Sequence, residues 1–166
     1  MPRMLLSGVA LGIGLGLVRG GRLERLGRLE LKSAQVLVMA VLARALAPFF
    51  REMGLVIDLT ALAGIVAWGI VNRRLPGAAA VAVGASLNFA VVFLNSGMPV
   101  GAVAILMAGA EMPGDPLHVQ LGPDTRMPLL ADVLPFGLFR SVYSVGDVVL
   151  ALGGFLVPYR ALRIVR

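Results

Sequence analysis

Four long apolar segments separated by arginine-containing connections, with a fifth that closes the chain after a longer segment, constrain this chain more than any other feature of its sequence. They cover residues 4–18, 34–50, 55–71, 78–94 and 142–159. A helix of about 17–25 apolar residues spans the hydrocarbon core of a bilayer, whereas shorter apolar segments usually belong to buried cores. The composition agrees, since 58% of the residues are hydrophobic and only 14% are charged. The sequence therefore predicts an all-α integral membrane protein, a single domain (residues 1–166) with five transmembrane helices.

The first apolar segment carries a glycine at every fourth position, at Gly8, Gly12, Gly16 and Gly20. In a helix this spacing puts the glycines on one face, where a neighbouring helix can approach the backbone closely. We expect this face to pack against another helix of the same chain; the alternative is homodimerisation through Gly8, Gly12 and Gly16. No small-residue cleavage pattern follows the segment, so we interpret it as a retained span and not as a signal peptide.

Arginine and lysine residues near the ends of the apolar segments predict how the chain crosses the membrane. If every segment crosses once, three basic regions share one side, namely residues 19–32, 73–74 and 160–166. Basic residues close to spans collect on the cytoplasmic side. The sequence therefore predicts a multi-pass protein of the cytoplasmic (inner) membrane, with its N-terminus outside, its C-terminus in the cytoplasm and residues 95–140 outside.

The net charge of +6 has the same origin and does not indicate nucleic-acid binding. Juxtamembrane cations each gain about 1 kcal/mol near an anionic leaflet, so the predicted partner is the lipid bilayer. Residues 22–31 combine leucines with arginines and suggest a short amphipathic helix on the inner surface. The chain has no cysteine and one histidine, which excludes thiolate chemistry and a histidine-rich metal cluster. We therefore expect no metal site and no cofactor.

The segment between the fourth and fifth spans is expected to form a small extracytoplasmic loop or hairpin. Residues 100–110 are apolar but too short to cross a bilayer, so we interpret them as a re-entrant or interfacial helix. Residues 117–121 alternate as a strand does, and a Gly-Pro-Asp turn follows at 122–124. These features predict a hairpin that continues into residues 126–133. A six-span alternative that uses residues 100–110 would place the C-terminal arginines outside, against the charge rule.

Three ionisable residues lie within the predicted spans: Arg44, Asp58 and Asp147. Charged groups at membrane depth are costly and mark functional sites by default. Arg44 and Asp58 lie on consecutive helices, each within about two turns of the connection between them, which predicts an intramembrane ion pair. Asn88 and Asn95 share one face of the fourth span and are expected to form hydrogen bonds across helices.

Asp147 has no cation in its own span to pair with, and it lies in the first turns of the fifth span. Asp132 lies just before that span, in an apolar stretch expected to rest at the outer interface. Two carboxylates at one partly dry site would share a proton, and such a pair can activate water for amide hydrolysis. The alternative is structural: Asp132 caps a short helix and Asp147 bonds to a neighbouring span. If the dyad forms, its candidate supporting residues are Asn95, His118 and Arg140.

The same stretches of sequence carry a resemblance to a known family. They are residues 95–100 (Asn-Ser-Gly-Met-Pro-Val), His118, residues 125–135 and residues 143–147 (Tyr-Ser-Val-Gly-Asp). These motifs are similar to those of an uncharacterised bacterial membrane family, the domain of unknown function 5317 family, and the resemblance covers essentially the whole chain. It implies a multi-helix bacterial membrane protein and supplies no activity.

A second resemblance, limited to three short stretches, does imply an activity. Residues 131–133 and 142–147 look like the two catalytic-aspartate motifs of lipoprotein signal peptidase, and residues 95–97 resemble its Asn-x-Gly motif. The resemblance implies that Asp132 and Asp147 are a catalytic pair. The chain departs from that family in lacking the Asn-x-x-Asp-Arg motif, because Ser144, Val145 and Gly146 precede the second aspartate.

These observations leave three functional hypotheses. The first is an aspartyl-type intramembrane hydrolase that acts near the outer leaflet. The second is a non-enzymatic scaffold or accessory protein that binds a partner or lipid through residues 95–140. The third, a small-solute transporter, is the least favoured, because transporter sites usually combine broken helices with internal repeats. Whether Asp132 and Asp147 converge separates the first hypothesis from the second.

Overall fold

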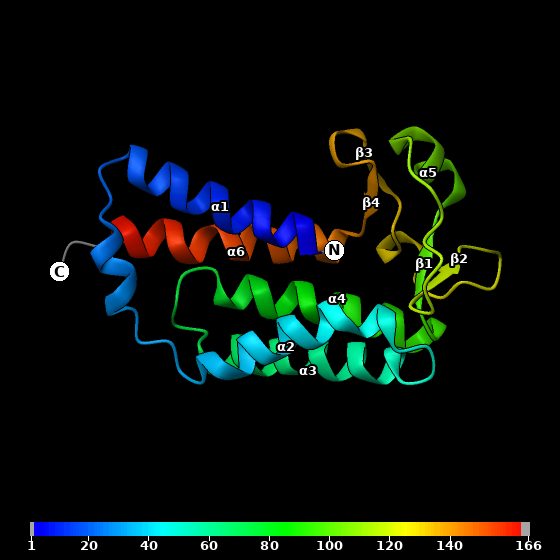
Figure 1. The fold of residues 1–166 in the computed structure, drawn as a ribbon, viewed down its shortest axis with the longest axis horizontal. Helices are drawn as coiled ribbons and strands as arrows, with labels where there is room; N and C mark the ends of the chain where they lie inside the picture. Colours follow the sequence, from blue (N-terminus) through cyan, green and yellow to red (C-terminus); the bar gives the residue numbers. More distant parts are fainter. Residues whose placement is uncertain (1, 164–166) are drawn as a thin grey trace.

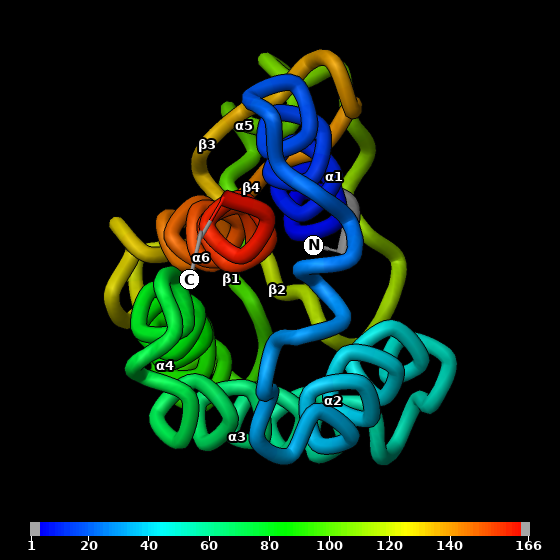
Figure 2. The backbone as a smooth tube through the Cα atoms, turned by 90° about the vertical axis from the view of Figure 1, so that its left-hand side faces the viewer, coloured from blue at the N-terminus to red at the C-terminus, as the bar shows by residue number. Residues whose placement is uncertain are grey.

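Long helices lie side by side along most of the molecule (Figure 1). The computed structural model describes residues 2–163, and the long helices are α1 (Pro2–Val18), α2 (Ala34–Leu46), α3 (Gly54–Val71), α4 (Ala78–Asn95) and α6 (Val145–Arg163). In space α1 packs on α6, α6 on α4, α4 on α3 and α3 on α2. Viewed along the helices, this order forms an arc with α1 and α2 at its ends (Figure 2).

Three of these helices, α3, α4 and α6, are long and apolar enough to cross a membrane. The helix α1 is slightly shorter, and α2 ends after 13 residues and continues as a short 3-10 helix, η2 (Ala47–Phe49), which contains Pro48. Buried Leu62, Ile65 and Trp68 of α3 contribute to a core between the helices. Large apolar side chains also cover the outside of the bundle, among them Leu11, Met39 and Phe93. An apolar exterior around an apolar core is compatible with a lipid environment.

The glycine face of α1 packs against α6 within the same chain. A Cβ atom on Gly8 would collide with the carbonyl oxygen of Ala151, and one on Gly16 would lie 2.6 Å from Leu162 Cδ1. Gly12 likewise faces the backbone of α6 at Phe155. The glycines at these positions therefore allow the two helices to approach each other closely. Of the two roles considered for this face, the structure displays packing inside the chain.

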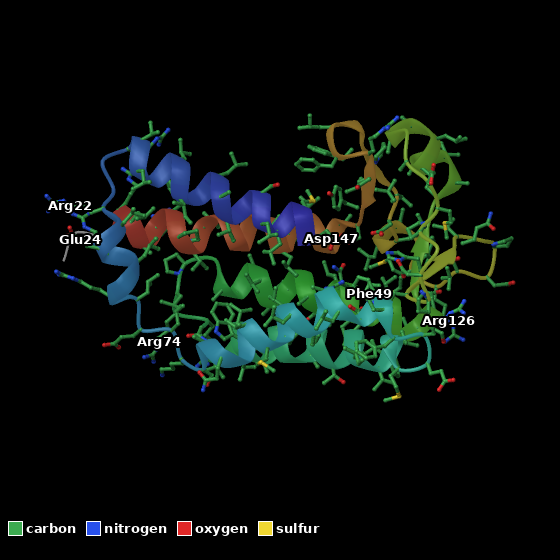
Figure 3. All side chains as sticks on the ribbon, in the orientation of Figure 1. Arg22, Glu24, Phe49, Arg74, Arg126 and Asp147 are labelled. Carbon is green, nitrogen blue, oxygen red and sulfur yellow. The ribbon has the colours of Figure 1, made fainter. Side chains whose placement is uncertain are left out.

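The two ends of the bundle differ in structure and charge. One end, called here the loop end, carries the segment between α4 and α6, and Phe49 and Arg126 lie there (Figure 3). The opposite end, called the basic end, holds Arg22 and Arg74 together with η1 (Leu23–Arg28), a 3-10 helix (Figure 3). The short helix predicted from the leucines and arginines of residues 22–31 is thus a 3-10 helix of six residues.

The loop end contains four short strands, which make the chain mostly but not entirely helical. Strand β1 (Met98–Val100) pairs in parallel with β2 (His118–Gln120), and β3 (Leu134–Phe136) pairs antiparallel with β4 (Ser141–Tyr143). The expected hairpin between residues 117–121 and 126–133 is therefore wrong. The segment 109–117 carries the chain back past β1 in the same direction, so β2 adds to β1 in parallel, and the hairpin forms later.

Three short helices complete the loop end: α5 (Ala102–Ala108), η3 (Pro128–Leu130) and η4 (Gly137–Phe139). The seven residues of α5 span only about 10 Å at 1.5 Å per residue, a third of the hydrocarbon core. This length argues against a sixth span at residues 100–110. The last long helix begins at Val145 and not at residue 142, because residues 141–143 belong to β4.

Candidate functional site

The first turn of α6 is closed by a reciprocal contact between Ser144 and Asp147. The backbone N–H of Asp147 donates to Ser144 Oγ at 3.0 Å, and the backbone N–H of Ser144 donates to Asp147 Oδ2 at 3.4 Å. This is the capping-box arrangement, with an aspartate in the place of the usual glutamate, and it satisfies two otherwise unpaired donors at the helix start. Ser144 therefore fixes the position of Asp147 at the loop end of the bundle.

Asn88 of α4 completes a fully buried polar network with these two residues. Its Nδ2 donates to Asp147 Oδ1 at 2.8 Å, and its Oδ1 accepts from Ser144 Oγ at 2.8 Å. The helices approach closely at this level, because Gly146 packs against the Asn88 side chain and a Cβ on Gly84 would lie 2.5 Å from the α6 backbone. The side chain of Asn88 is 0% exposed, so these hydrogen bonds are protected from competition with water.

Asp132 lies in the loop segment, beside strand β1. Its backbone N–H donates to Pro99 O at 2.9 Å and its carbonyl accepts from Gly101 N at 3.0 Å, so it lies beside β1 as a one-residue bridge to Val100. Of the structural alternative, the helix cap by Asp132 is wrong, because no helix of the described residues begins there, whereas the bond of Asp147 to a neighbouring span is present. Its side chain is buried, and within residues 2–163 no hydrogen-bond partner is found for Oδ1. A buried oxygen without a partner is costly and calls for an explanation.

The electrostatic surroundings of Asp132 favour its protonated form. Burial raises the pKa of the Asp132 carboxyl well above its usual range, and the negative charge of Asp147 raises it further. Both carboxyl groups are nearly inaccessible, with exposed fractions of 3% for Asp132 and 5% for Asp147. A carboxyl group with an elevated pKa can donate a proton at neutral pH. Asp132 is thus a buried carboxyl group whose protonation responds to the charge of Asp147, and Asp147 is itself held by hydrogen bonds.

A cavity of about 40 Å³ opens beside Asp147, among side chains of α1, α2, α3 and α6. Arg44 and Asp147 are its charged lining residues, and its walls are otherwise apolar. This volume has room for roughly two or three water molecules, and the two charged groups supply the polar contacts that a buried water requires. Arg44 also forms an ion pair with Asp58, with 3.2 Å between Nε and Oδ1 and side-chain exposures of 13% and 6%. The ion pair and the aspartate of α6 therefore belong to one region.

The remaining candidate residues have other contacts. Asn95 binds the loop backbone, accepting from Arg126 N at 2.8 Å and donating to Arg126 O at 3.0 Å. His118 Nδ1 lies 2.8 Å from Asp115 Oδ1. Arg140 is exposed in the turn between β3 and β4, in a left-handed conformation with φ of 46°. Among the hydrogen bonds of the described residues, none joins Asn95, His118 or Arg140 to either aspartate. No group of three or more acidic or histidine side chains within residues 2–163 is suited to hold a metal ion.

Comparison with known families agrees with the motifs at this site. A family model described as a family of unknown function (DUF5317) matches residues 28–159. The chain belongs to this family. No curated protein and no solved structure matches the chain. The polar residues described above, called here the polar region, all lie inside the matched range of this DUF5317 protein. They are Arg44, Asp58, Asn88, Asp132, Ser144 and Asp147.

Sequence reasoning missed Ser144 as a residue of the site. The signal was nevertheless present, because Ser-x-x-Asp directly before an apolar segment is a variant of the capping box. The sequence predicts that Asn88 joins helices by a hydrogen bond, and the structure shows that its partner is Asp147.

Proposed function

We propose that this DUF5317 protein is an aspartyl-type hydrolase that cleaves an amide bond near the outer leaflet of the bacterial cytoplasmic membrane. The observation that carries the proposal is the pair of nearly inaccessible carboxyl groups, in which the charge of Asp147 raises the pKa of Asp132. When two neighbouring carboxyl groups lie in different surroundings, their pKa values differ, so that one can act as the acid and the other as the base.

In this proposal Asp147 is the base and Asp132 is the acid. Asp147 takes a proton from a water molecule, whose oxygen attacks the substrate carbonyl carbon, while Asp132 gives its proton to the carbonyl oxygen. The tetrahedral intermediate then collapses: the C–N bond breaks, the leaving amine takes the proton from Asp147, and Asp132 regains its own proton. Asn88 and Ser144 hold the Asp147 carboxylate in one orientation throughout. The cavity beside Asp147 is a route by which water would reach it.

Isotope incorporation tests this function without knowledge of the substrate. The purified protein, in lipid nanodiscs, would be incubated with bacterial membrane extract in water enriched in the heavy oxygen isotope. Hydrolysis places the heavy oxygen in a new carboxyl terminus, which mass spectrometry detects. The wild type should generate labelled products, and Asp132→Asn and Asp147→Asn should each abolish them. The matched control is Asp124→Asn, an exposed aspartate of the same loop segment, which should leave labelling unchanged.

Two outcomes would reject the hydrolase. One is labelling that persists in both aspartate variants, and the other is the absence of labelled products from the wild type across extracts of several bacteria. The folded state of each variant would be checked by its thermal unfolding, so that a loss of labelling is attributed to chemistry.

The proposed topology has five spans, with the loop end outside and the basic end in the cytoplasm. It is supported by the arginines gathered at the basic end, where Arg22 and Arg74 lie (Figure 3), and by the charge rule for membrane proteins. A reporter fused after Arg166 should then indicate the cytoplasm, and one inserted at Gly122 should indicate the outside. Reporters that indicate the same side would contradict five spans.

A second candidate function, a scaffold that binds lipid or a membrane partner through the loop end, has its own support. The helix α5 and the 3-10 helix η4, which contact each other, expose large apolar side chains, with Leu106 at 80% and Leu138 at 82%. Exposed apolar patches often mark interaction sites. In this case Leu106→Ser with Leu138→Ser should reduce membrane or partner association, whereas Asp147→Asn should affect stability alone.

A further inference from the structure

A large hollow of about 710 Å³ lies at the basic end of the bundle, and neither Asp132 nor Asp147 lines it. Its lining residues come from the segment that contains η1, from the α3–α4 connection and from the end of α6. Five cationic side chains line it: Arg22, Arg25, Arg28, Lys32 and Arg74.

Hydrogen bonds at both of its ends hold the η1 segment in place. Arg25 Nη1 donates to the carbonyl oxygen of Leu162 at 3.0 Å, which ties η1 to α6. At the other end Asn72 donates to Lys32 O and accepts from Lys32 N, both at 3.0 Å, which ties the segment to α3. A further bond from Asn72 Nδ2 to Trp68 O at 2.9 Å fixes the amide itself. These hydrogen bonds fix the position of the η1 segment relative to α3 and α6, so the shape of the hollow is defined by specific contacts.

The charge of the hollow is unbalanced. Its five cations face only two acidic side chains, Glu24 and Glu30, which leaves three positive charges in excess (five minus two). Within residues 2–163 the ion pairs are Arg44–Asp58 and His118–Asp115, so no cation of the hollow is neutralised by an ion pair. Like charges that share one space repel each other, and a multivalent anion bound among them relieves that repulsion.

The chemistry of the lining favours phosphate. Arginine presents a planar fork of N–H donors that matches two phosphate oxygens, and four of the five cations are arginines. Leu29, Leu75 and Ala161 add apolar surface beside the cations. Basic pockets between helices with apolar walls suit the headgroups of anionic phospholipids. We propose that this hollow binds the phosphate group of an anionic phospholipid from the adjoining leaflet.

The test compares two double variants that remove the same charge from the same end of the protein. Arg28→Gln with Arg74→Gln removes two cations that line the hollow, and neither side chain makes a hydrogen bond among the described residues. The matched control, Arg73→Gln with Arg160→Gln, removes two exposed cations that do not line it. The full-length proteins would be unfolded thermally in detergent micelles doped with phosphatidylglycerol or, for comparison, with phosphatidylcholine. A separate series would use inorganic phosphate against chloride at equal ionic strength.

Phosphatidylglycerol should raise the Tm of the wild type and of the control, and phosphatidylcholine should not. Without lipid the hollow variant should be at least as stable as the wild type, because two mutually repelling cations are removed, and it should bind phosphatidylglycerol roughly thirtyfold more weakly, since each cation contributes about fivefold. If inorganic phosphate alone reproduces the rise, the ligand is a soluble phosphate and the lipid assignment is overturned. If both double variants lose the phosphatidylglycerol-dependent rise in Tm equally, the attraction is a diffuse surface effect and the site is overturned. The site is also overturned if neither phosphatidylglycerol nor inorganic phosphate raises the Tm of the wild type.

Discussion

The Arg44–Asp58 ion pair offers a quantitative test of the bundle at its loop end. With 3.2 Å between the charged atoms, the attraction is about 5 kcal/mol at an effective dielectric constant of about 20. The cost of removing both charges from water offsets much of that gain, so the net contribution of the pair is small. Removal of one partner is different, because it leaves the other charge buried and uncompensated, which costs about 3–5 kcal/mol. The two side chains are only 13% and 6% exposed, so water cannot easily replace the missing partner.

We therefore expect Arg44→Leu and Asp58→Leu each to lower the free energy of unfolding by about 3–5 kcal/mol. The double variant should lose less than about 2 kcal/mol, because two apolar side chains then replace two charges. Circular dichroism during denaturation in detergent would measure each value. Arg51→Leu with Glu52→Leu is the control, since these exposed charges lie in the adjacent turn and should each change stability by less than about 0.5 kcal/mol. Additive effects of Arg44→Leu and Asp58→Leu would refute the energetic coupling of the pair.

Three further predictions follow from the packing and the polar region. Gly8→Val should destabilise the protein by about 1–3 kcal/mol in detergent unfolding, because the valine side chain would collide with Ala151. Gly14→Ala, at a position with open space around it, should not destabilise the protein. Equal effects of the two substitutions would contradict the α1–α6 contact. Asn88→Ala should cost about 1–3 kcal/mol in the same assay by leaving buried polar partners unsatisfied, and a silent substitution would argue against the network. The raised pKa of Asp132 means that the folded protein retains a proton the unfolded chain has released, so wild-type stability should fall as the pH rises above about 3.9. The Tm of Asp132→Asn relative to wild type should then increase between about pH 4 and neutrality, and a constant difference would contradict the shift.

The helices could be predicted from the sequence because their signals are local. The structure begins α3 at Gly54 and ends α4 at Asn95, each within one residue of the apolar segments 55–71 and 78–94. The resemblance to the DUF5317 family is confirmed by the match over residues 28–159. The contact between Arg44 and Asp58 is also of a kind that sequence can anticipate, since a short connection between antiparallel helices fixes which residues lie opposite each other.

The loop end could not be predicted in the same way. Its strands have three residues each, which is too few to show a clear alternation, and both β1 and β3 contain a proline. The contact of Asn88 with Asp147 joins residues 59 positions apart and depends on the register between α4 and α6, which close packing at Gly84 and Gly146 sets. Such a register results from tertiary packing and leaves no periodic trace in the sequence.

Infrared spectroscopy of the Asp132 carboxyl group tests most directly whether the two aspartates act as a coupled pair. In protein labelled with carbon-13 aspartate, the carbonyl band of a protonated carboxyl should be present at neutral pH, and part of it should disappear in Asp132→Asn. The charge of Asp147 contributes to the raised pKa of Asp132, so Asp147→Asn should move the titration midpoint of that band to lower pH. A midpoint that stays at the same pH in Asp147→Asn would show that the two carboxyl groups do not interact, and the hydrolase proposal would fall with it.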